Sequence, residues 1–195
     1  MGKIYFVLGK SSSGKDTIFS RLKENQELGL KTVVGYTTRP MRQGEEEGVE
    51  YFFVSPKRLE ELQEEGKVIE CRHYHTVHGV WSYFTVDDGQ IDLKEGDYLY
   101  IGTLESFNDM VRYYGKEVVV PIFIEVETGE RLERAIHRER QQSEPKYAEL
   151  CRRFLADEED FSEEKIEKAG IHRRFENQVL EDCIQEITEM IQGKQ

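Results

Sequence analysis

A glycine- and serine-rich stretch near the start of the chain constrains the fold more than any other feature. Residues 9–17 read GKSSSGKDT, which fits the pattern G-x-x-x-x-G-K. The stretch follows residues 3–9, an apolar run typical of a buried parallel strand, and opens residues 15–26, where apolar side chains recur with helical spacing. Strand, glycine-rich turn and helix in this order predict a phosphate-binding loop at the start of an α/β fold.

The predicted loop offers a phosphate chain both backbone and side-chain donors. Glycines at both ends let the backbone wrap closely around phosphate, while exposed N–H groups and the helix N-terminus supply positive potential. Lys15 adds a point charge for the β- and γ-phosphates of a nucleotide such as ATP. The predicted ATP-binding residues are Gly9, Lys10, Ser11, Ser12, Ser13, Gly14, Lys15, Asp16 and Thr17.

Asp16 departs from the pattern, which has Ser or Thr after the lysine to bind Mg²⁺. A carboxylate ~5 Å from a phosphate charge costs about 3 kcal/mol at an effective dielectric of 20, so Asp16 either binds a cation or turns away. Aspartate is a natural Mg²⁺ ligand, but an acid at the start of a helix also favours the helix dipole. The residues leave both interpretations open, and Asp16 and Thr17 are the candidate Mg²⁺ ligands.

The order of the remaining elements predicts the architecture. Further strands are predicted at 31–38, 51–55, 68–75, 80–86, 98–103, 118–126 and 173–178, and further helices at 55–66, 104–115, 130–141, 147–161 and 179–192. A first strand–helix unit is thus followed by a β-rich insertion and three more strand–helix units. This order predicts an α/β fold of the P-loop NTPase type, with a five-stranded parallel core sheet covered by helices on both faces.

A segment at residues 37–55, TTRPMRQGEEEGVEYFFVS, places two arginines close together. The guanidinium groups of Arg39 and Arg42 suit a phosphate dianion, because each can donate two parallel N–H bonds, and Tyr51 adds a neutral donor. The alternative is that both arginines pair at the surface with the adjacent glutamates at 45–47. The residues taken alone favour this alternative.

The same segment resembles the pattern T-T-R-x-x-R-x-G-E-x-x-G-x-x-Y-x-F of guanylate kinases. Together with the phosphate loop and the order of elements, the resemblance covers nearly the whole chain. It implies ATP-dependent phosphorylation of GMP or dGMP to GDP, with Mg²⁺ as cofactor. It also implies that Arg39, Arg42 and Tyr51 hold the acceptor phosphate, and that Glu70 accepts hydrogen bonds from N1–H and N2–H of guanine.

The chain departs from the family pattern at three places. Gly35 stands where the family has a serine that contacts the base. The family's Y-G-[ST] is replaced by residues 76–86, TVHGVWSYFTV, where Tyr83 or Trp81 would contact phosphate and Thr85 or Ser82 the base. The family's Asp-x-Asp is missing at residues 100–106, where the only acid is Glu105. The predicted acceptor-binding residues are Arg39, Arg42, Tyr51, Glu70 and Tyr83.

A run of arginines lies on the predicted helix at 130–141. Arg131, Arg134 and Arg138 share one helical face, and Arg153 lies on the following helix. The usual fate of such a run is a solvated helix with surface ion pairs. The resemblance implies instead a mobile lid whose arginines close over the ATP phosphates, with Arg134, Arg138 and Arg153 matching best and Arg152 as a substitute. The predicted catalytic residues are Lys15, Arg39, Arg134, Arg138 and Arg153.

The resemblance divides a single domain into three parts and sets the expected reaction. The parts are a core (1–34, 92–127 and 170–195), an acceptor-binding subdomain (35–91) and a lid (128–169). Transfer of the γ-phosphoryl group is expected to be in-line and to need no general base, because the acceptor is already an anion. Two alternatives stay open: a kinase for another nucleoside monophosphate or small phosphorylated acceptor, and a non-catalytic guanylate-kinase-like interaction module.

Composition and charge restrict the partners. A net charge of -12 would repel nucleic acid and anionic membranes. The resemblance implies that the partners are ATP and a nucleoside monophosphate, GMP. Cys71, Cys151 and Cys183 are far apart and suggest neither a disulfide framework nor a zinc site. The apolar run at 4–8 is too short for a signal peptide or a membrane-spanning helix. We expect a cytoplasmic monomer or homodimer.

Overall fold

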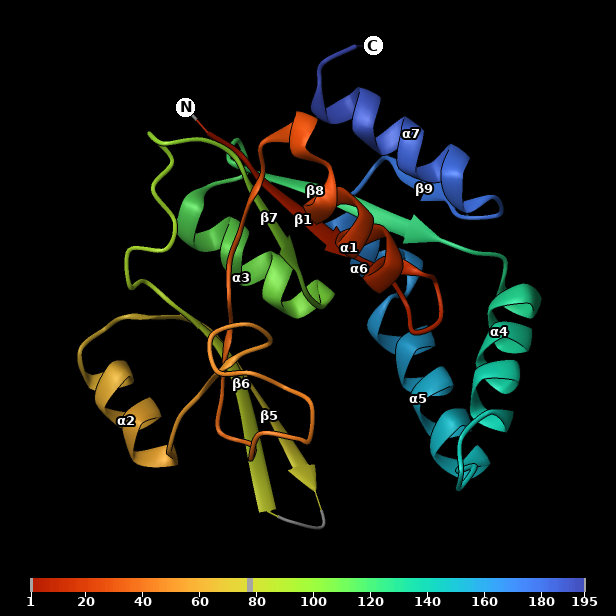
Figure 1. Ribbon diagram of the computed structural model, residues 1–195, viewed down its shortest axis with the longest axis horizontal. Coiled ribbons are helices and arrows are strands. Elements are labelled where there is room, and N and C mark those ends of the chain that lie inside the picture. Colours follow the sequence, from red (N-terminus) through yellow and green to blue (C-terminus); the bar gives the residue numbers. More distant parts are fainter. Residues whose placement is uncertain (1, 77–78, 195) are drawn as a thin grey trace.

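A computed structural model describes residues 2–76 and 79–194, and its central sheet is the predicted one (Figure 1). The sheet has five strands in the order β2-β7-β1-β8-β9, and every neighbouring pair is parallel. The strands are β1 (Ile4–Leu8), β2 (Lys31–Thr32), β7 (Tyr98–Ile101), β8 (Val119–Glu125) and β9 (Arg174–Glu176). The predicted five-stranded parallel core is confirmed.

Side chains of β1 alternate between two hydrophobic layers, as expected for a strand covered on both faces. Ile4, Phe6 and Leu8 pack in the layer that includes α3 and α6. Tyr5 and Val7 pack in the layer that includes α1 and α7. The helices are α1 (Lys15–Glu24), α3 (Leu104–Tyr114), α6 (Glu163–Lys168) and α7 (Leu180–Ile191). The core therefore fills both faces of the sheet and holds β1, and the loop that follows it, in place.

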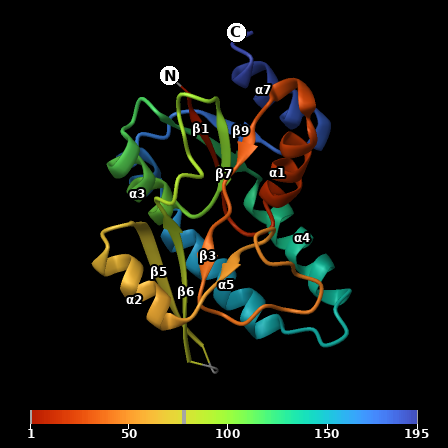
Figure 2. The same cartoon turned by 60° about the vertical axis from the view of Figure 1, so that its left-hand side comes forward.

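A second, smaller sheet carries the β-rich insertion (Figures 1 and 2). Its strand order is β4-β3-β6-β5, and α2 packs against it through Leu59 and Leu62. Ser55 caps α2 as predicted, since its hydroxyl accepts a hydrogen bond from the backbone N–H of Arg58 at 3.1 Å. The elements are β3 (Tyr36–Thr37), β4 (Phe52–Phe53), α2 (Pro56–Glu64), β5 (Val68–Thr76) and β6 (Gly79–Val86).

The strand predicted at 31–38 is wrong as a single element. The chain forms β2 in the core sheet, leaves it at Val33, and forms β3 in the second sheet. Between them the Gln90 side chain replaces a strand partner: it accepts from the Val34 N–H at 2.9 Å and donates to the Val34 carbonyl at 3.1 Å. One apolar run thus connects the two sheets and lines the space where they meet.

The carboxyl ends of the parallel strands gather the loops that form the candidate site. The phosphate loop follows β1, Thr103 follows β7 and Asn177 follows β9. After β8 comes a helical hairpin of α4 (Thr128–Arg140) and α5 (Tyr147–Asp160), which projects beside the sheet on the opposite side from α2 (Figure 1). A short 3₁₀ turn at Gln26–Leu28 lies between α1 and β2.

Within residues 2–76 and 79–194, none of the helices combines the length and the apolar character needed to cross a bilayer. The three cysteines are free thiols. Cys183 is buried in the core on α7, where burial raises its pKa to about 11. It therefore stays a neutral thiol that packs as a small apolar side chain.

Candidate nucleotide-binding site

The phosphate loop is tightly wrapped and fixed to the strand end of β9. Gly14 has φ 86°, and a Cβ atom there would lie 2.3 Å from Nδ2 of Asn177. That amide donates a hydrogen bond to the carbonyl of Ser13 at 2.8 Å. Ser12 adopts φ 65°, a left-handed conformation that is unfavourable for a residue with a side chain. The second glycine of the motif is therefore required both for its conformation and for its contact with Asn177.

Two hydroxyl groups in the loop are buried without a hydrogen-bond partner in the described part of the chain. They belong to Ser12 and Ser13. A buried polar group left unpaired costs about 1–3 kcal/mol, so such groups are unusual in a folded protein. Phosphate oxygens are strong acceptors that would satisfy such hydroxyls. The orphaned hydroxyls are thus a second observation, besides the motif, that fits a phosphate ligand.

Lys15 and Asp16 begin α1 and lie together at the edge of a large cavity. The Lys15 ammonium group lies 3.3 Å from the Asp16 carboxylate, and the Asp16 side chain is 81% exposed. Thr17 is exposed in the same helical turn. An exposed carboxylate beside the loop lysine can bind a cation through water, and it also sits where an acid favours the helix dipole.

The cavity has a volume of about 1090 Å³ and connects the regions predicted to bind the two nucleotides. Ligand pockets are typically about 300–1,000 Å³, so this one can hold more than a single mononucleotide. It extends from α1 across the strand ends to the second sheet and to α5. Its polar lining includes Lys15, Tyr51, Arg72, Tyr83, Thr103 and Arg152.

Of the predicted acceptor residues, the two tyrosines lie on the cavity wall. The rings of Tyr51 and Tyr83 contact each other edge-to-face with centroids 5.5 Å apart. Burial raises the pKa of the Tyr51 hydroxyl, which keeps it protonated and able to donate. Between the two alternatives left by the sequence, Tyr83 is the one paired with Tyr51, although Trp81 also lines the cavity.

Arg39 lies behind this wall and pairs with Glu45. Its guanidinium carbon is 5.3 Å from the centroid of the Tyr51 ring, and its Nη1 and Nη2 donate to the two Glu45 oxygens at 2.7 and 2.5 Å. The hydrogen bonds from Arg39 hold the pKa of Glu45 down at about 2. Arg42 is exposed and donates its backbone N–H to Glu45 at 2.7 Å. The structure thus shows for Arg39 the ion pair that the sequence offered as an alternative.

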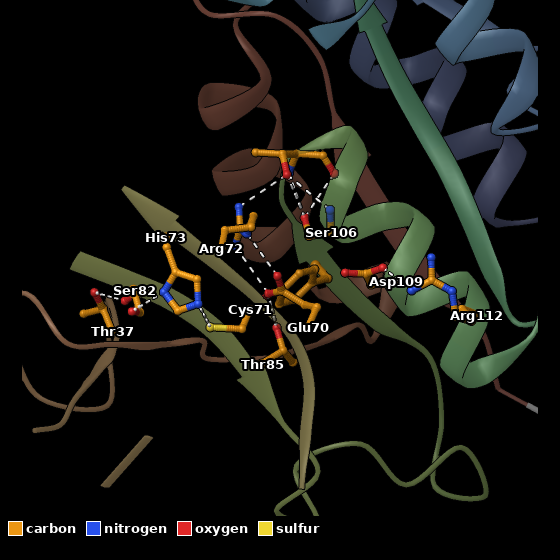
Figure 3. Close-up of polar contacts among 12 residues, drawn as sticks. Thr37, Glu70, Cys71, Arg72, His73, Ser82, Thr85, Ser106, Asp109 and Arg112 are labelled. Atoms are coloured by element: carbon orange, nitrogen blue, oxygen red, sulfur yellow. Dashed lines mark hydrogen bonds and ion pairs between the residues drawn. The ribbon is translucent and has the colours of Figure 1, made fainter. Parts of the chain in front are cut away.

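Glu70 is fully enclosed by a polar network (Figure 3). Its side chain is 0% exposed, and it accepts from Arg72 Nε at 3.0 Å, Arg72 Nη2 at 3.3 Å and the Thr85 hydroxyl at 2.8 Å. The Thr85 hydroxyl is also 2.6 Å from the Tyr100 hydroxyl. Burial raises the pKa of Glu70, while Arg72 and Thr85 act in the opposite direction. Glu70 therefore lies beneath the cavity surface, with Arg72 between it and the cavity.

The other base-contact candidates are placed as follows. Thr85, not Ser82, adjoins Glu70, because the Ser82 hydroxyl contacts His73 Nδ1 at 2.8 Å (Figure 3). Gly35 lines the cavity, and a Cβ atom there would make ordinary contacts, 3.6 Å from the Phe84 carbonyl at the closest. Glu105 is exposed on α3. Residues 77 and 78 of the 76–86 stretch lie outside the described residues.

Arg131 differs from the expectation for a lid arginine. It is buried, its guanidinium carbon lies 3.9 Å from the centroid of the Phe154 ring, and it forms ion pairs with Asp157 and Glu158 of α5. Asp157 also accepts the backbone N–H of Ser11 at 2.8 Å, and Glu158 pairs with Lys10 at 2.8 Å. This charged cluster joins the helical hairpin to the phosphate loop.

The remaining lid arginines differ in their contacts and in whether they line the cavity. Arg134 donates to the carbonyl of Asn177 at 2.8 Å and so contacts the residue that fixes the phosphate loop. Arg138 is exposed. Arg153 is 3.9 Å from both Glu139 and Glu149. Arg152 pairs with Glu149, and it is Arg152 rather than Arg153 that lines the cavity.

Sequence reasoning missed Arg72, Asn177, Asp157 and Glu158. Arg72 carried a signal, because side chains two residues apart share one face of a strand, which places Arg72 beside Glu70. Asn177 also carried one, since it ends the last parallel strand at the edge where the phosphate loop lies. Asp157 and Glu158 of α5 had no such signal in the sequence, because only the tertiary position of the hairpin brings them to the phosphate loop.

The described residues contain no cluster of three or more His, Cys, Asp or Glu side chains able to hold a metal ion. Mg²⁺ is usually bound by one or two carboxylates together with substrate phosphates and water. Asp16, at the edge of the cavity beside the loop lysine, offers an oxygen donor of that kind.

The parallel sheet, the phosphate loop after β1 and the helical hairpin after β8 define a P-loop NTPase fold. Comparison with known proteins finds a sequence similarity to guanylate kinases in the first half of the chain. The guanylate kinase family model matches residues 1–83. The guanylate kinase of Aliivibrio fischeri is 37% identical over 93 residues, which are 45% of each chain. The guanylate kinase of Neisseria gonorrhoeae is 46% identical over 61 residues, which are 31% of this chain and 29% of the relative. The sequence match thus spans about half the length of the first of these relatives.

A structural match covers the whole chain. The crystal structure of guanylate kinase from Anaplasma phagocytophilum superposes with a TM-score of 0.67 at 21% sequence identity, over 100% of this chain and 86% of that one. At this identity the likeness concerns the fold. The sequence match lies in the first half of the chain, and the structural match shows that the whole chain has the fold of that kinase.

Proposed function

We propose that the protein phosphorylates GMP or dGMP at the expense of ATP. The observation that supports this most directly is that one continuous cavity extends from Lys15 at the phosphate loop to Tyr51 and Tyr83 on the second sheet. Donor and acceptor phosphates bound at its two ends would meet within it. The matched residues 1–83 include both ends, because they contain the loop and the acceptor segment.

In the proposed mechanism the chain positions two phosphates and neutralises their charge. The loop N–H groups and Lys15 hold the ATP phosphates, Tyr51, Tyr83 and Arg42 hold the acceptor, and Arg39 adds positive charge from behind Tyr51. Phosphoryl transfer needs little covalent assistance, so positioning and positive charge supply most of the rate enhancement. A reaction that uses ATP and GMP suits the cytoplasm, the compartment expected from the sequence.

The lid residues act, in this proposal, by closing on the cavity. Arg152 already lies on the cavity wall, and Arg134 contacts the residue that fixes the phosphate loop. Arg138 and Arg153 would reach the phosphates only after the α4–α5 hairpin moves toward the second sheet. Such closure also excludes water, which would otherwise hydrolyse ATP.

A panel of acceptors tests the proposed function. ADP release is measured with GMP, dGMP, AMP, CMP and UMP, and turnover is expected to be highest with the guanine nucleotides. Turnover with a different monophosphate would identify the protein as a kinase for another acceptor. Absence of turnover with all five, together with tight binding of a protein partner, would favour the interaction-module alternative.

Asp16 is expected to support Mg²⁺ binding together with the ATP phosphates. Replacing it in Asp16→Asn removes the negative charge at an exposed position, so the fold should be retained. We expect the Mg²⁺ concentration needed for half-maximal ATP binding to rise several-fold, measured by titration calorimetry without acceptor. The same titration of Thr17→Ala, which removes the other candidate Mg²⁺ ligand, serves as the matched comparison. An unchanged Mg²⁺ requirement in Asp16→Asn would assign Asp16 to the helix dipole alone.

Arg42 is expected to serve the acceptor rather than ATP. A charge-assisted hydrogen bond contributes roughly 1.5–3 kcal/mol, so Arg42→Ala should raise the KM for GMP by about 10- to 150-fold. The KM for ATP should change little. Arg58→Ala, another exposed arginine of the same subdomain, is the control. A larger rise in the KM for ATP than in the KM for GMP would show that Arg42 contacts ATP, contrary to this proposal.

A further inference from the structure

The acceptor oxygens of Glu70 are already occupied in the folded chain. One oxygen receives the Thr85 hydroxyl and Arg72 Nη2, and the other receives Arg72 Nε. The side chain is 0% exposed, and Glu70 is not among the described residues that line the cavity. Accepting N1–H and N2–H from guanine would require Glu70 to break these contacts and displace Arg72, which covers it.

Arg72 presents donors where Glu70 was expected to present acceptors. Its side chain is 14% exposed and lines the cavity. Nη1 makes a long contact, 3.4 Å, with the Thr103 hydroxyl, and the Tyr74 hydroxyl also interacts with the guanidinium group, so these weakly held N–H groups are the ones that a ligand can recruit. Tyr74, the next side chain on this face of β5, also lines the cavity. The wall at this end of the cavity is therefore rich in hydrogen-bond donors.

Donors of this geometry suit one edge of a purine. Guanine and hypoxanthine carry two adjacent acceptors, O6 and N7, and an arginine can donate to both at once. Adenine keeps N7 but replaces O6 with an amino group, whose hydrogens would face the guanidinium. An arginine held by a buried carboxylate is also well fixed in orientation, because the pair limits its rotation.

We propose that Arg72 is the residue that reads the acceptor base, through O6 and N7, and that the acceptor class is the 6-oxopurine 5′-monophosphates, IMP as well as GMP. Glu70 and Thr85 then position Arg72 and make no contact with the base. This inference rests on the proposed function, since it concerns the acceptor end of the same cavity. It assigns the distinction between acceptors to O6 and N7 of the base instead of N1–H and N2–H.

Nucleotide analogues test the proposal on the unmodified protein. Values of kcat/KM are compared for GMP, IMP, 7-deaza-GMP and AMP with saturating ATP. IMP lacks the 2-amino group that Glu70 would read but keeps O6 and N7, so we expect it to lie within about threefold of GMP. Loss of N7 in 7-deaza-GMP removes one of the two acceptors and should lower kcat/KM by about 10- to 150-fold, the range for one charge-assisted hydrogen bond.

The opposite pattern would overturn the proposal. If IMP is at least a hundredfold poorer than GMP while 7-deaza-GMP equals it, the base is read at N1–H and N2–H and Glu70 must become exposed on binding. If none of the monophosphates releases ADP, the proposed function itself has failed. The two failures are therefore distinguishable in one set of assays.

A charge-neutral double variant separates base reading from fold. Glu70→Gln with Arg72→Gln removes both charges together, and thermal unfolding checks that it folds. We expect it to lose the preference for GMP over AMP and the penalty for 7-deaza-GMP, while the KM for ATP changes little. Arg58→Gln with Glu61→Gln, an ion pair on α2 away from the cavity wall, is the matched control. A folded double variant that keeps both preferences would contradict the role of Arg72.

Discussion

Lys15→Ala is expected to lower kcat by at least about 10²–10³-fold while the fold is retained, the range seen when one preorganised charge-stabilising donor is removed. The Lys15 ammonium group has its ion pair with Asp16, which is 81% exposed, so its loss should cost little stability. In phosphoryl transfer the lysine of such a loop stabilises charge on the β- and γ-phosphates. The effect on turnover should therefore greatly exceed the effect on folding.

The measurement pairs ADP release with circular dichroism and thermal unfolding of the same sample. Lys57→Ala, an exposed lysine on α2, should have wild-type turnover and serves as the control. Lys10→Ala is informative as well, because Lys10 belongs to the loop but pairs with Glu158 at 2.8 Å. Near-normal turnover in folded Lys15→Ala would remove the basis for assigning a kinase.

The sequence predicted the parts of the fold that depend on local signals. The apolar run at 3–9, the glycines of the phosphate loop and the helical spacing after Lys15 lie within one short segment, and together they determine β1, the loop and α1. The five-stranded sheet followed because strands alternating with helices favour parallel pairing. The resemblance to guanylate kinases added the expected reaction and acceptor, which no local pattern alone could supply.

Features that depend on tertiary partners could not be predicted in the same way. The run at 31–38 has the composition of one strand, but it divides because Gln90, distant in sequence, occupies the backbone groups of Val34. Arg131 shares a helical face with Arg134, yet the position of α5 buries it against Phe154. Helical spacing shows which residues share a face; it does not show which of them the neighbouring helix covers.

The Glu70–Arg72 pair is such a feature, and it leads to the second large expected effect. Removing one partner of a buried ion pair typically costs about 3–5 kcal/mol, because the other charge is left desolvated. Glu70 is enclosed, and Arg72 supplies two of its three hydrogen bonds. Arg72→Leu should therefore lower the free energy of unfolding by about 3–5 kcal/mol near neutral pH. In a chain of this size that corresponds to a fall in Tm of roughly 6–20 °C.

The stability lost in Arg72→Leu should depend on pH, and the direction follows from the pKa of Glu70. Burial already raises the pKa of Glu70 above its ordinary value of 4.5, and removing Arg72 raises it further. A carboxyl with a raised folded-state pKa binds more protons in the folded state, so stability falls as pH rises from the ordinary value through the raised one. The difference between Arg72→Leu and wild type should thus be smallest near the ordinary glutamate pKa and reach its full size above the raised pKa.

Urea unfolding at several pH values measures this difference, and a second substitution isolates its cause. Glu70→Gln combined with Arg72→Leu removes the ionisable group, so it should recover most of the lost stability at neutral pH and show none of the added pH dependence. Asp109→Asn combined with Arg112→Leu is the matched control on α3. The arginine of this pair is exposed, so the control should change the free energy of unfolding little. If Arg72→Leu is equally destabilised at all pH values, or if the double variant is no more stable than the single one, the cost comes from lost packing of the arginine stem. The carboxylate would then tolerate burial without its partner, and the account of Glu70 as a fixed support for Arg72 would be wrong.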